Sequence, residues 1–300
     1  MRYLTPTLFL LFFFASAVVH AGDDKTDFLR IGRDDRGRAM TLDTAIVRYQ
    51  KDDVPVPTES VMTVDLIGAV HVADRQYFKA LNKQFEEYDV LLYELVAPKG
   101  TRPTPGKTDP DNPAHIIQDM LKTFLGLEHQ LSCIDYTKDN MIHADLSPAE
   151  LFKKMDKRGD TFFTIFLSTM AESMRQQNLS EKKTKYKNPK DIITDEELLA
   201  GIVEAMLTER GSPTLRRFLA LQFGEDPTEQ LKAFGGPLGQ LLISDRNKAV
   251  MTVLNEQMEK GKVRVGVFYG AGHLPDLEVR LKKLGFKKKS STWLSAWQLR

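Results

Sequence analysis

The feature that most constrains the fold is an alternation of apolar strand and amphipathic helix over residues 61–95. Residues 61–67 are β-branched or apolar except for Asp65, and they run into a glycine. Behind Asp74, apolar residues recur at helical spacing, and residues 89–95 (DVLLYEL) form a nearly continuous apolar run. Such a run is typical of a strand that is covered on both faces. A strand–helix–strand unit implies parallel pairing with a right-handed crossover, so we expect an α/β fold.

A second unit of this kind lies near the end of the chain. The phrase strand, Gly-x-x-His, helix occurs at 61–87 and again at 263–284. Further strands are expected at 39–49 and 286–299, and an amphipathic helix at 241–260. Together these elements predict a mixed central sheet with helices on its faces.

The middle of the chain reads as helical. Ser147-Pro148-Ala149-Glu150 is a complete capping box with proline in the first turn, so a helix begins there. We expect one domain over residues 22–300, with a helical insert at about 147–235. A short strand is expected at 130–136.

Residues 1–21 have the pattern of a secretory signal peptide. Arg2 precedes an uncharged apolar run at 8–19, and small residues surround Ala21. The run is shorter than the roughly 20 residues of a membrane-spanning helix, and no later run approaches that length. We therefore expect an exported protein, periplasmic or secreted, with no integral membrane segment once the signal is removed.

Charge and cysteine content exclude several classes of protein. The 42 basic and 41 acidic residues leave a formal charge of +1, which does not predict binding to nucleic acid. The single cysteine, Cys133, excludes a disulfide framework and a zinc site built from several thiolates.

Two histidines and a glutamate are the candidate chemical groups. His71 follows the strand-ending Gly68 by three residues, and His273 follows Gly270 in the same way. The glycines permit a tight turn at the carboxyl edge of the sheet, where α/β proteins bind ligands. Glu94 ends the strand that follows the first unit, so its carboxylate is expected at the same edge.

These groups predict an open site for a metal ion held by His71, His273 and Glu94. Two imidazoles and a carboxylate are suitable ligands, and the ion would acidify a bound water molecule for hydrolysis. Each histidine also has a structural interpretation as a satisfied polar group, and Glu94 has one as a paired carboxylate.

Three further residues are candidates for the site. Arg246 lies on the apolar stripe of the 241–260 helix, so it needs either an acidic partner or an oxyanion to bind. His143 and Asp145 precede the capping box in an expected loop. They are candidates for orienting a ligand, or else for forming a local turn.

The motifs Gly68-Ala69-Val70-His71, Tyr93-Glu94, Asp245-Arg246-Asn247 and Gly270-Ala271-Gly272-His273 resemble those of the TraB/GumN/PrgY family, to which the Tiki metalloproteases belong. The resemblance extends over about residues 60–300. It implies a core shared with erythromycin-esterase-like and ChaN-like proteins. For Tiki relatives it implies peptide cleavage that depends on a divalent metal, with manganese or cobalt preferred.

The leading hypothesis is therefore an exported metal-dependent hydrolase, with a peptide as its expected substrate. In this hypothesis Glu94 and Arg246 are catalytic. One alternative is a non-catalytic protein that sequesters a peptide or small molecule. Another is a metal-free, esterase-like hydrolase in which a histidine acts as the base.

Overall fold

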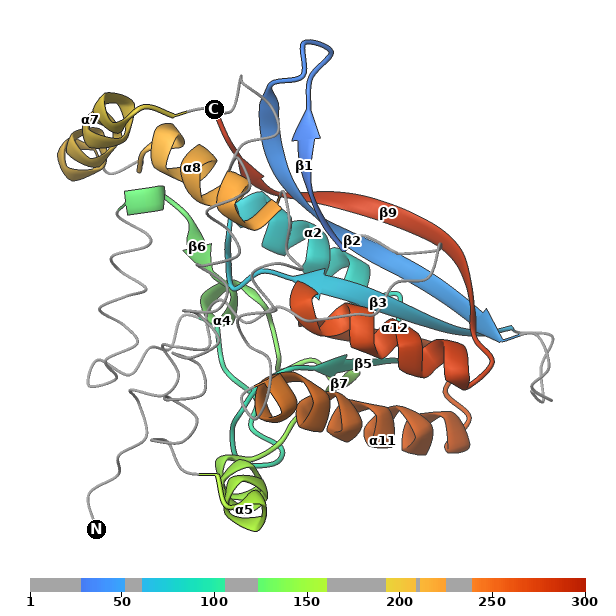
Figure 1. The fold of residues 1–300 in the computed structure, drawn as a ribbon. Coiled ribbons are helices and arrows are strands. Elements are labelled where there is room, and N and C mark those ends of the chain that lie inside the picture. Colours follow the sequence, from blue (N-terminus) through green and yellow to red (C-terminus); the bar gives the residue numbers. More distant parts are fainter. Residues whose placement is uncertain (1–27, 52–60, 106–123, 161–192, 209–210, 225–238) are drawn as a thin grey trace, which may run out of the picture.

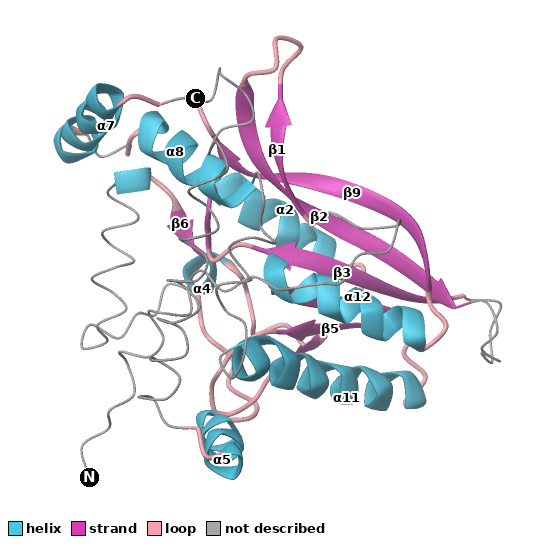
Figure 2. Cartoon of the chain, in the orientation of Figure 1, coloured by secondary structure: helices cyan, strands magenta, loops and turns pink. Residues whose placement is uncertain are grey.

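A mixed sheet of seven strands forms the centre of the molecule (Figures 1 and 2). The computed structural model describes residues 28–51, 61–105, 124–160, 193–208, 211–224 and 239–300. The strands follow one another in the order β1-β2-β3-β8-β5-β7, and β9 pairs with the other edge of β2. Their bounds are β1 Leu29–Arg33, β2 Ala39–Lys51, β3 Met62–Ala69, β5 Val90–Tyr93, β7 Met141–His143, β8 Arg264–Gly270 and β9 Lys287–Gln298.

The sheet has a parallel half and an antiparallel half. β3, β8, β5 and β7 are parallel to one another. β1, β2 and β9 form the antiparallel part, which joins the parallel part where β2 pairs antiparallel with β3. All four residues of β5 are buried, as the continuous apolar run predicts. The prediction of an α/β fold with a mixed central sheet is confirmed.

The strand–helix–strand unit has the predicted direction but not direct pairing. The helix α2 (Arg75–Phe85) connects β3 to β5, and β8 lies between these two strands and pairs with both. Gly266 of β8 stands opposite Leu91 of β5, and a Cβ at this glycine would lie only 2.3 Å from Leu91 Cδ1. β8, from the far end of the chain, therefore separates β3 and β5, the two strands that the local pattern predicts to pair with each other.

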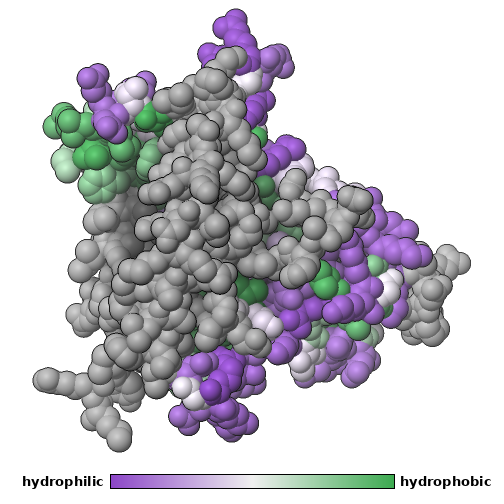
Figure 3. Space-filling model, viewed as in Figure 1, coloured by the Kyte–Doolittle hydropathy of each residue, from purple (hydrophilic) through white to green (hydrophobic). Residues whose placement is uncertain are grey.

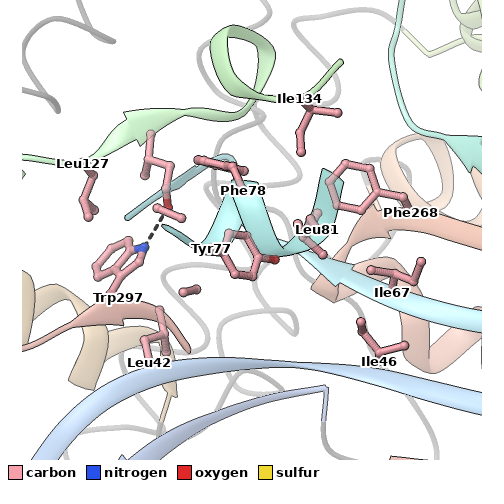
Figure 4. Close-up of a cluster of buried hydrophobic side chains, with 14 of the residues drawn as sticks. Leu42, Ile46, Ile67, Tyr77, Phe78, Leu81, Leu127, Ile134, Phe268 and Trp297 are labelled. Atoms are coloured by element: carbon pink, nitrogen blue, oxygen red, sulfur yellow. Dashed lines mark hydrogen bonds between the residues drawn. The ribbon is translucent and has the colours of Figure 1, made fainter. Parts of the chain in front are cut away.

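Helices cover both faces of the parallel strands. On one face α2 contributes Tyr77, Phe78, Leu81 and Phe85 to a buried cluster that also contains Phe268 (Figure 4). In this cluster Trp297 of β9 donates a hydrogen bond from Nε1 to the carbonyl of Val72, at 2.7 Å (Figure 4). The other face is packed by α11 (Asp245–Glu259) and α12 (Leu274–Lys283), which bury residues that include Val250, Leu254, Leu277 and Leu281.

The described part of the middle region is mostly helical. It contains α5 (Pro148–Arg158), α7 (Asp195–Leu207) and α8 (Pro213–Gly224). The capping box predicted at Ser147 and Glu150 is present at the start of α5. The helix α8 lies against β1, β2 and β9. One face of α7 exposes apolar side chains at the surface (Figure 3), namely those of Leu199, Val203, Met206 and Leu207.

Two local predictions are wrong, and a third position differs in detail. Residues 130–136 do not form a strand, because β6 (Glu128–His129) ends there and a short helix, α4 (Gln130–Cys133), begins. Asp74 is the N-cap residue of α2, but its side chain makes no capping hydrogen bond, because its carboxylate binds Arg216 and the backbone of Gln298 instead. His143 is not in a loop, because it pairs with Tyr93 as the last residue of β7.

Other expectations concern residues outside the described ranges. The predicted signal peptide at 1–21 and much of the predicted insert lie there. Within the described ranges, no helix combines the length and the apolar character needed to cross a membrane.

Candidate functional site

The carboxyl ends of β3, β8 and β5 bring the predicted site residues to one edge of the sheet. β3 and β8 pair directly, with Ala69 opposite Gly270, so the two Gly-x-x-His turns leave neighbouring strands. Glu94 directly follows β5, and its backbone N–H donates to the carbonyl of Phe268 in β8. This pairing places the carboxylate of Glu94 beside the second turn.

Glu94 is the centre of a buried polar cluster that also contains Arg246, Asp145, His273 and His71. Its Oε2 accepts a hydrogen bond from the backbone N–H of Gly270 at 2.6 Å, and its Oε1 accepts one from Arg246 Nη2 at 2.5 Å. A Cβ at position 270 would lie 3.2 Å from Oε2, so glycine permits this close approach. Burial by itself would raise the pKa of Glu94, but the nearby charge of Arg246 and the imidazoles of His273 and His71 hold it well below its usual range.

Arg246 is paired with two carboxylates rather than open to a ligand. Its side chain is 6% exposed, and it donates from Nε to Asp145 Oδ1 at 3.0 Å and from Nη2 to Asp145 Oδ2 at 2.6 Å. The same Nη2 also reaches Glu94. The sequence predicts either an acidic partner or a bound oxyanion for Arg246, and in the structure its partners are acidic side chains. Asp145 is fully buried and also accepts a hydrogen bond from the backbone N–H of Leu146.

His273 is buried and held in a defined orientation. Its Nδ1 lies 2.7 Å from Asn247 Oδ1, and its Nε2 lies 3.5 Å from Glu94 Oε1. Asn247 Nδ2 donates to the carbonyl of His273 at 3.0 Å and to Asp276 Oδ2 at 2.8 Å. Because those two groups only accept hydrogen bonds, the oxygen of the Asn247 amide must be the atom that faces His273.

The tautomer of His273 follows from this geometry. An amide oxygen accepts and does not donate, so Nδ1 carries the proton and Nε2 presents a lone pair toward Glu94. Burial lowers the pKa of His273 to about 4, against the opposing effect of Glu94. The imidazole is therefore neutral at neutral pH, which is the form that binds a metal ion or accepts a proton.

His71 belongs to the same cluster. Burial lowers the pKa of His71, Glu94 raises it, and Arg246 lowers it further, while the side chain of Gln130 acts to raise it. His71 in turn lowers the pKa of His273. Gln130 is oriented by its own donation from Nε2 to the hydroxyl of Tyr136, at 2.8 Å.

His143 stands apart from the carboxylates. Its Nε2 donates to the carbonyl of Leu95 at 2.5 Å, and its ring packs against that of Tyr93 with the centroids 5.7 Å apart. Its buried Nδ1 has no hydrogen-bond partner among the described residues. His143 therefore engages backbone and an aromatic ring, whereas its predicted companion Asp145 binds Arg246.

Gly68 lies at a crowded point under the first turn. Its carbonyl accepts a hydrogen bond from the hydroxyl of Tyr77, and a Cβ there would lie 3.2 Å from the carbonyl oxygen of Ala45. Both predicted turn glycines thus occupy positions where a side chain would meet a neighbouring group.

The start of α11 supplies three consecutive buried residues. A π-helical turn over Gln240–Ser244 precedes Asp245, Arg246 and Asn247. Asp245 binds Arg158 at 2.5 Å, while Arg246 and Asn247 reach Glu94 and His273 respectively. Single π-helical turns are frequent at functional sites.

Sequence reasoning missed Asn247 and Gln130 as partners of the histidines. In the sequence Asn247 stands out only as the last residue of the motif Asp245-Arg246-Asn247, although it adjoins Arg246 at the buried start of a helix. Its signal is the polar side chain itself, because a buried carboxamide needs partners for both of its ends. Gln130 has no such signal, because its position depends on the short helix α4.

A pocket of about 350 Å³ lies at the opposite edge of the sheet. Its lining includes Arg48, Thr63, Glu87, Tyr88 and Arg264. Arg48 is held there by two hydrogen bonds to the buried Asp65, at 2.8 and 2.7 Å. None of the predicted site residues lines this pocket.

Comparisons with known proteins provide no relative. No family model, no curated protein and no solved structure matches the chain. The resemblance to the TraB/GumN/PrgY family stays a prediction that depends on the four motifs.

The donor types of the cluster fit a divalent metal ion, although the donors are not assembled as a complete ligand set. His273 offers a bare Nε2 beside Glu94 Oε1, and its Nδ1–H is held by a carbonyl-type oxygen, as is usual for a metal-binding histidine. In the described parts of the chain, no three His, Cys, Asp or Glu side chains converge closely enough to hold a metal ion as they stand. Arg246 also occupies the oxygen of Glu94 that faces His273.

Proposed function

We propose that this chain is an exported hydrolase that uses a divalent metal ion, held by His71, His273 and Glu94, to cleave peptides. The observation that supports this proposal most is the pair formed by His273 Nε2 and Glu94 Oε1, 3.5 Å apart. Neither atom carries a proton at neutral pH, so two lone pairs face each other. A cation or the hydrogens of a water molecule would relieve this repulsion.

The proposed chemistry divides between these residues. A bound metal ion would supply a water molecule of lowered pKa and would polarise the scissile carbonyl. Glu94 would accept the proton of the attacking water, since its carboxylate is ionised and held in place by Gly270. His273 and His71 would act as neutral nitrogen ligands. Arg246 would orient Glu94 and keep it ionised, rather than bind the substrate.

The type of α/β core and the export of the protein are part of the same proposal. We infer a core like that of erythromycin-esterase-like and ChaN-like proteins, with a helical insert at about 147–235. The inference depends on the motifs and on the two strand–Gly-x-x-His–helix units, which leave paired strands. Export depends on the pattern of residues 1–21, and cleavage of the signal would be checked by the N-terminal mass of the exported protein.

A metal-free hydrolase is the second candidate, and one observation favours it. Arg246 already neutralises part of the charge of Glu94, so the cluster is less dependent on a dication. In this candidate His273 Nε2 would be the base that takes a proton from water. A non-catalytic binder would use the same groups without turnover.

The test measures metal content and peptide hydrolysis on the same purified protein. We expect a bound divalent ion, hydrolysis of a peptide library, and loss of activity after chelation that returns when manganese, cobalt or zinc is added. Full activity after exhaustive chelation would replace the proposal with the metal-free hydrolase. Metal binding or peptide binding without any turnover would replace it with the binder.

The variant Glu94→Gln separates the two roles of this carboxylate. If Glu94 accepts the proton, turnover should fall by roughly 10²–10⁴-fold while metal content stays near that of the wild type. If Glu94 is mainly a ligand, metal content should fall as well. Glu256→Gln, an exposed glutamate on α11, is the matched control and should change neither quantity. Unchanged metal content and rate in Glu94→Gln would remove Glu94 from the site.

A further inference from the structure

We propose that Asn247 is a positioning residue that holds His273 in the tautomer with a proton on Nδ1 and a bare Nε2. The inference rests on the proposed function, because it explains how the ring presents a lone pair to a metal ion or a water molecule. It concerns a residue that itself touches neither the substrate nor the ion.

The neighbour on the other side of the ring favours the opposite tautomer. Glu94 Oε1 lies 3.5 Å from His273 Nε2, and a proton on that nitrogen would point at an ionised carboxylate. Without Asn247, an Nε2–H donor facing Glu94 would be the more favourable arrangement. The ring therefore occupies the tautomer that its charged neighbour disfavours, which requires a compensating acceptor at Nδ1. Asn247 Oδ1, at 2.7 Å, is that acceptor.

The direction of the Asn247 amide is set by a chain of hydrogen bonds that cannot be reversed. Arg280 donates from Nε to Asp276 Oδ2 at 2.7 Å, and Asp276 accepts from Asn247 Nδ2 at 2.8 Å. The guanidinium only donates and the carboxylate only accepts, so the amide nitrogen must face Asp276 and the amide oxygen must face His273. The backbone carbonyl of His273 accepts from the same Nδ2 and opposes rotation of the amide.

Because both residues are buried, the hydrogen bond to Asn247 determines the tautomer of His273. Asn247 is fully buried and His273 is 2% exposed, so water does not substitute for a missing partner. Asn247 Oδ1 can only accept a hydrogen bond, so the residue specifies which ring nitrogen of His273 carries the proton.

The experiment reads the tautomer directly. The wild-type protein and Asn247→Leu are labelled with ¹⁵N-histidine, stripped of metal with a chelator, and compared at neutral pH by long-range ¹H–¹⁵N correlation. His273→Gln assigns the resonance. We expect a protonated Nδ1 in the wild type, and a shift of the proton to Nε2 in Asn247→Leu. Hydrolysis by the variant should fall by roughly 10–100-fold.

A second variant keeps the test valid if Asn247→Leu does not fold. Asp276→Ala removes the acceptor that fixes the amide, and its side chain is 27% exposed, so the change is milder for the core. It should also increase the population with a proton on Nε2. Asp156→Ala, an exposed aspartate on α5, is the control and should leave the tautomer unchanged.

The outcomes separate this inference from the proposed function. A proton on Nε2 in the wild type, or on Nδ1 in both folded variants, would overturn the role of Asn247 whatever the activity. The expected tautomers without any hydrolysis would support that role and contradict the hydrolase. The tautomer is measured without metal or substrate, so the two results are independent.

Discussion

At the scale of single residues, the cluster is organised around one buried arginine. Arg246 binds Asp145 with two of its nitrogens and Glu94 with one of them, and all three side chains are at most 10% exposed. Burial by itself would lower the pKa of Arg246, but Asp145 and Glu94 raise it well above its usual range. The arginine is therefore charged at every accessible pH, and its charge lowers the pKa of Glu94.

The planar geometry of this arginine predicts the effect of a conservative change. Arg246→Lys keeps the charge but cannot donate to Asp145 from two positions while also reaching Glu94. We expect it to lower the free energy of unfolding by about 1–3 kcal/mol, because buried acceptors lose their partners. Chemical denaturation monitored by circular dichroism would measure this loss.

A surface arginine provides the comparison for that prediction. Arg264 pairs with Asp89 at 3.4 Å, and its side chain is 61% exposed. Arg264→Lys should change the free energy of unfolding by less than about 0.5 kcal/mol, since exposed ion pairs contribute little. Equal effects of the two substitutions would contradict a special role for the buried arginine.

At the scale of secondary-structure elements, the helix α5 shows how a short sequence pattern determines a helix start. Ser147 Oγ accepts from the backbone N–H of Glu150 at 3.3 Å, and Glu150 Oε2 accepts from the backbone N–H of Ser147 at 2.8 Å. Both hydrogen bonds are local, so they form wherever the remainder of the chain allows a helix to begin. The helix α11 is different, because the buried Arg246 in its first turn has its partners Asp145 and Glu94 in other elements, 101 and 152 residues away.

The carboxylate of this capping box predicts a pH-dependent contribution to stability. The hydrogen bonds with Ser147 and the charge of Lys99 lower the pKa of Glu150 from its usual 4.5 to about 2. A lowered pKa in the folded state means that the stabilising effect is present above pH 4.5 and is lost as the pH falls toward 2. Since the side chain is 37% exposed, we expect a contribution of less than about 1 kcal/mol.

Glu150→Gln tests this contribution. The free energy of unfolding of the variant should be lower than that of the wild type at about pH 6, and the difference should shrink as the pH approaches about 3. A difference that grows on acidification would have the wrong sign and would contradict the assigned pKa shift.

At the scale of the whole molecule, the site depends on one strand that joins distant parts of the chain. β8 pairs with β3 on one side and with β5 on the other. The Gly-x-x-His turn that follows β8 therefore lies beside the one that follows β3, and Gly270 lies beside Glu94. Gly266 is a crowded position in this strand, because a Cβ would lie 2.3 Å from Leu91 Cδ1 and 3.0 Å from Tyr88 Cδ2.

Overpacking at this point should affect stability and the site together. We expect Gly266→Ala to lower the free energy of unfolding by about 1–3 kcal/mol, because the buried side chains of Leu91 and Tyr88 must shift to make room for the methyl group. Ser290→Ala, at an exposed position of β9, should have an effect below about 0.5 kcal/mol. A folded Gly266→Ala variant of wild-type stability would show that the contact between β8 and β5 is not restrictive.

Much of the fold follows from local patterns. The apolar runs of β3, β5 and β8, the amphipathic face of α2 and the capping box of α5 each express a preference that acts within about ten residues. These patterns predict an α/β chain with a mixed sheet. They also place His71, Glu94 and His273 after strands, where the carboxyl edge of a parallel sheet gathers side chains.

The tertiary structure alone decided which groups meet at that edge. The order of the strands, with β8 between β3 and β5, depends on a fit between Gly266 and residues of β5 that no local pattern contains. The partners of Arg246 and His273 are Asp145, Glu94 and Asn247, and all but one of these pairs join separate elements across more than 100 residues. The sequence by itself determined that an arginine buried on a helix needs an acidic partner, because an unpaired buried charge is costly. Which carboxylates fill that need, and which tautomer His273 adopts, were decided by the packing of α11 against the sheet, because hydrogen bonds are directional and depend on the final positions of both atoms.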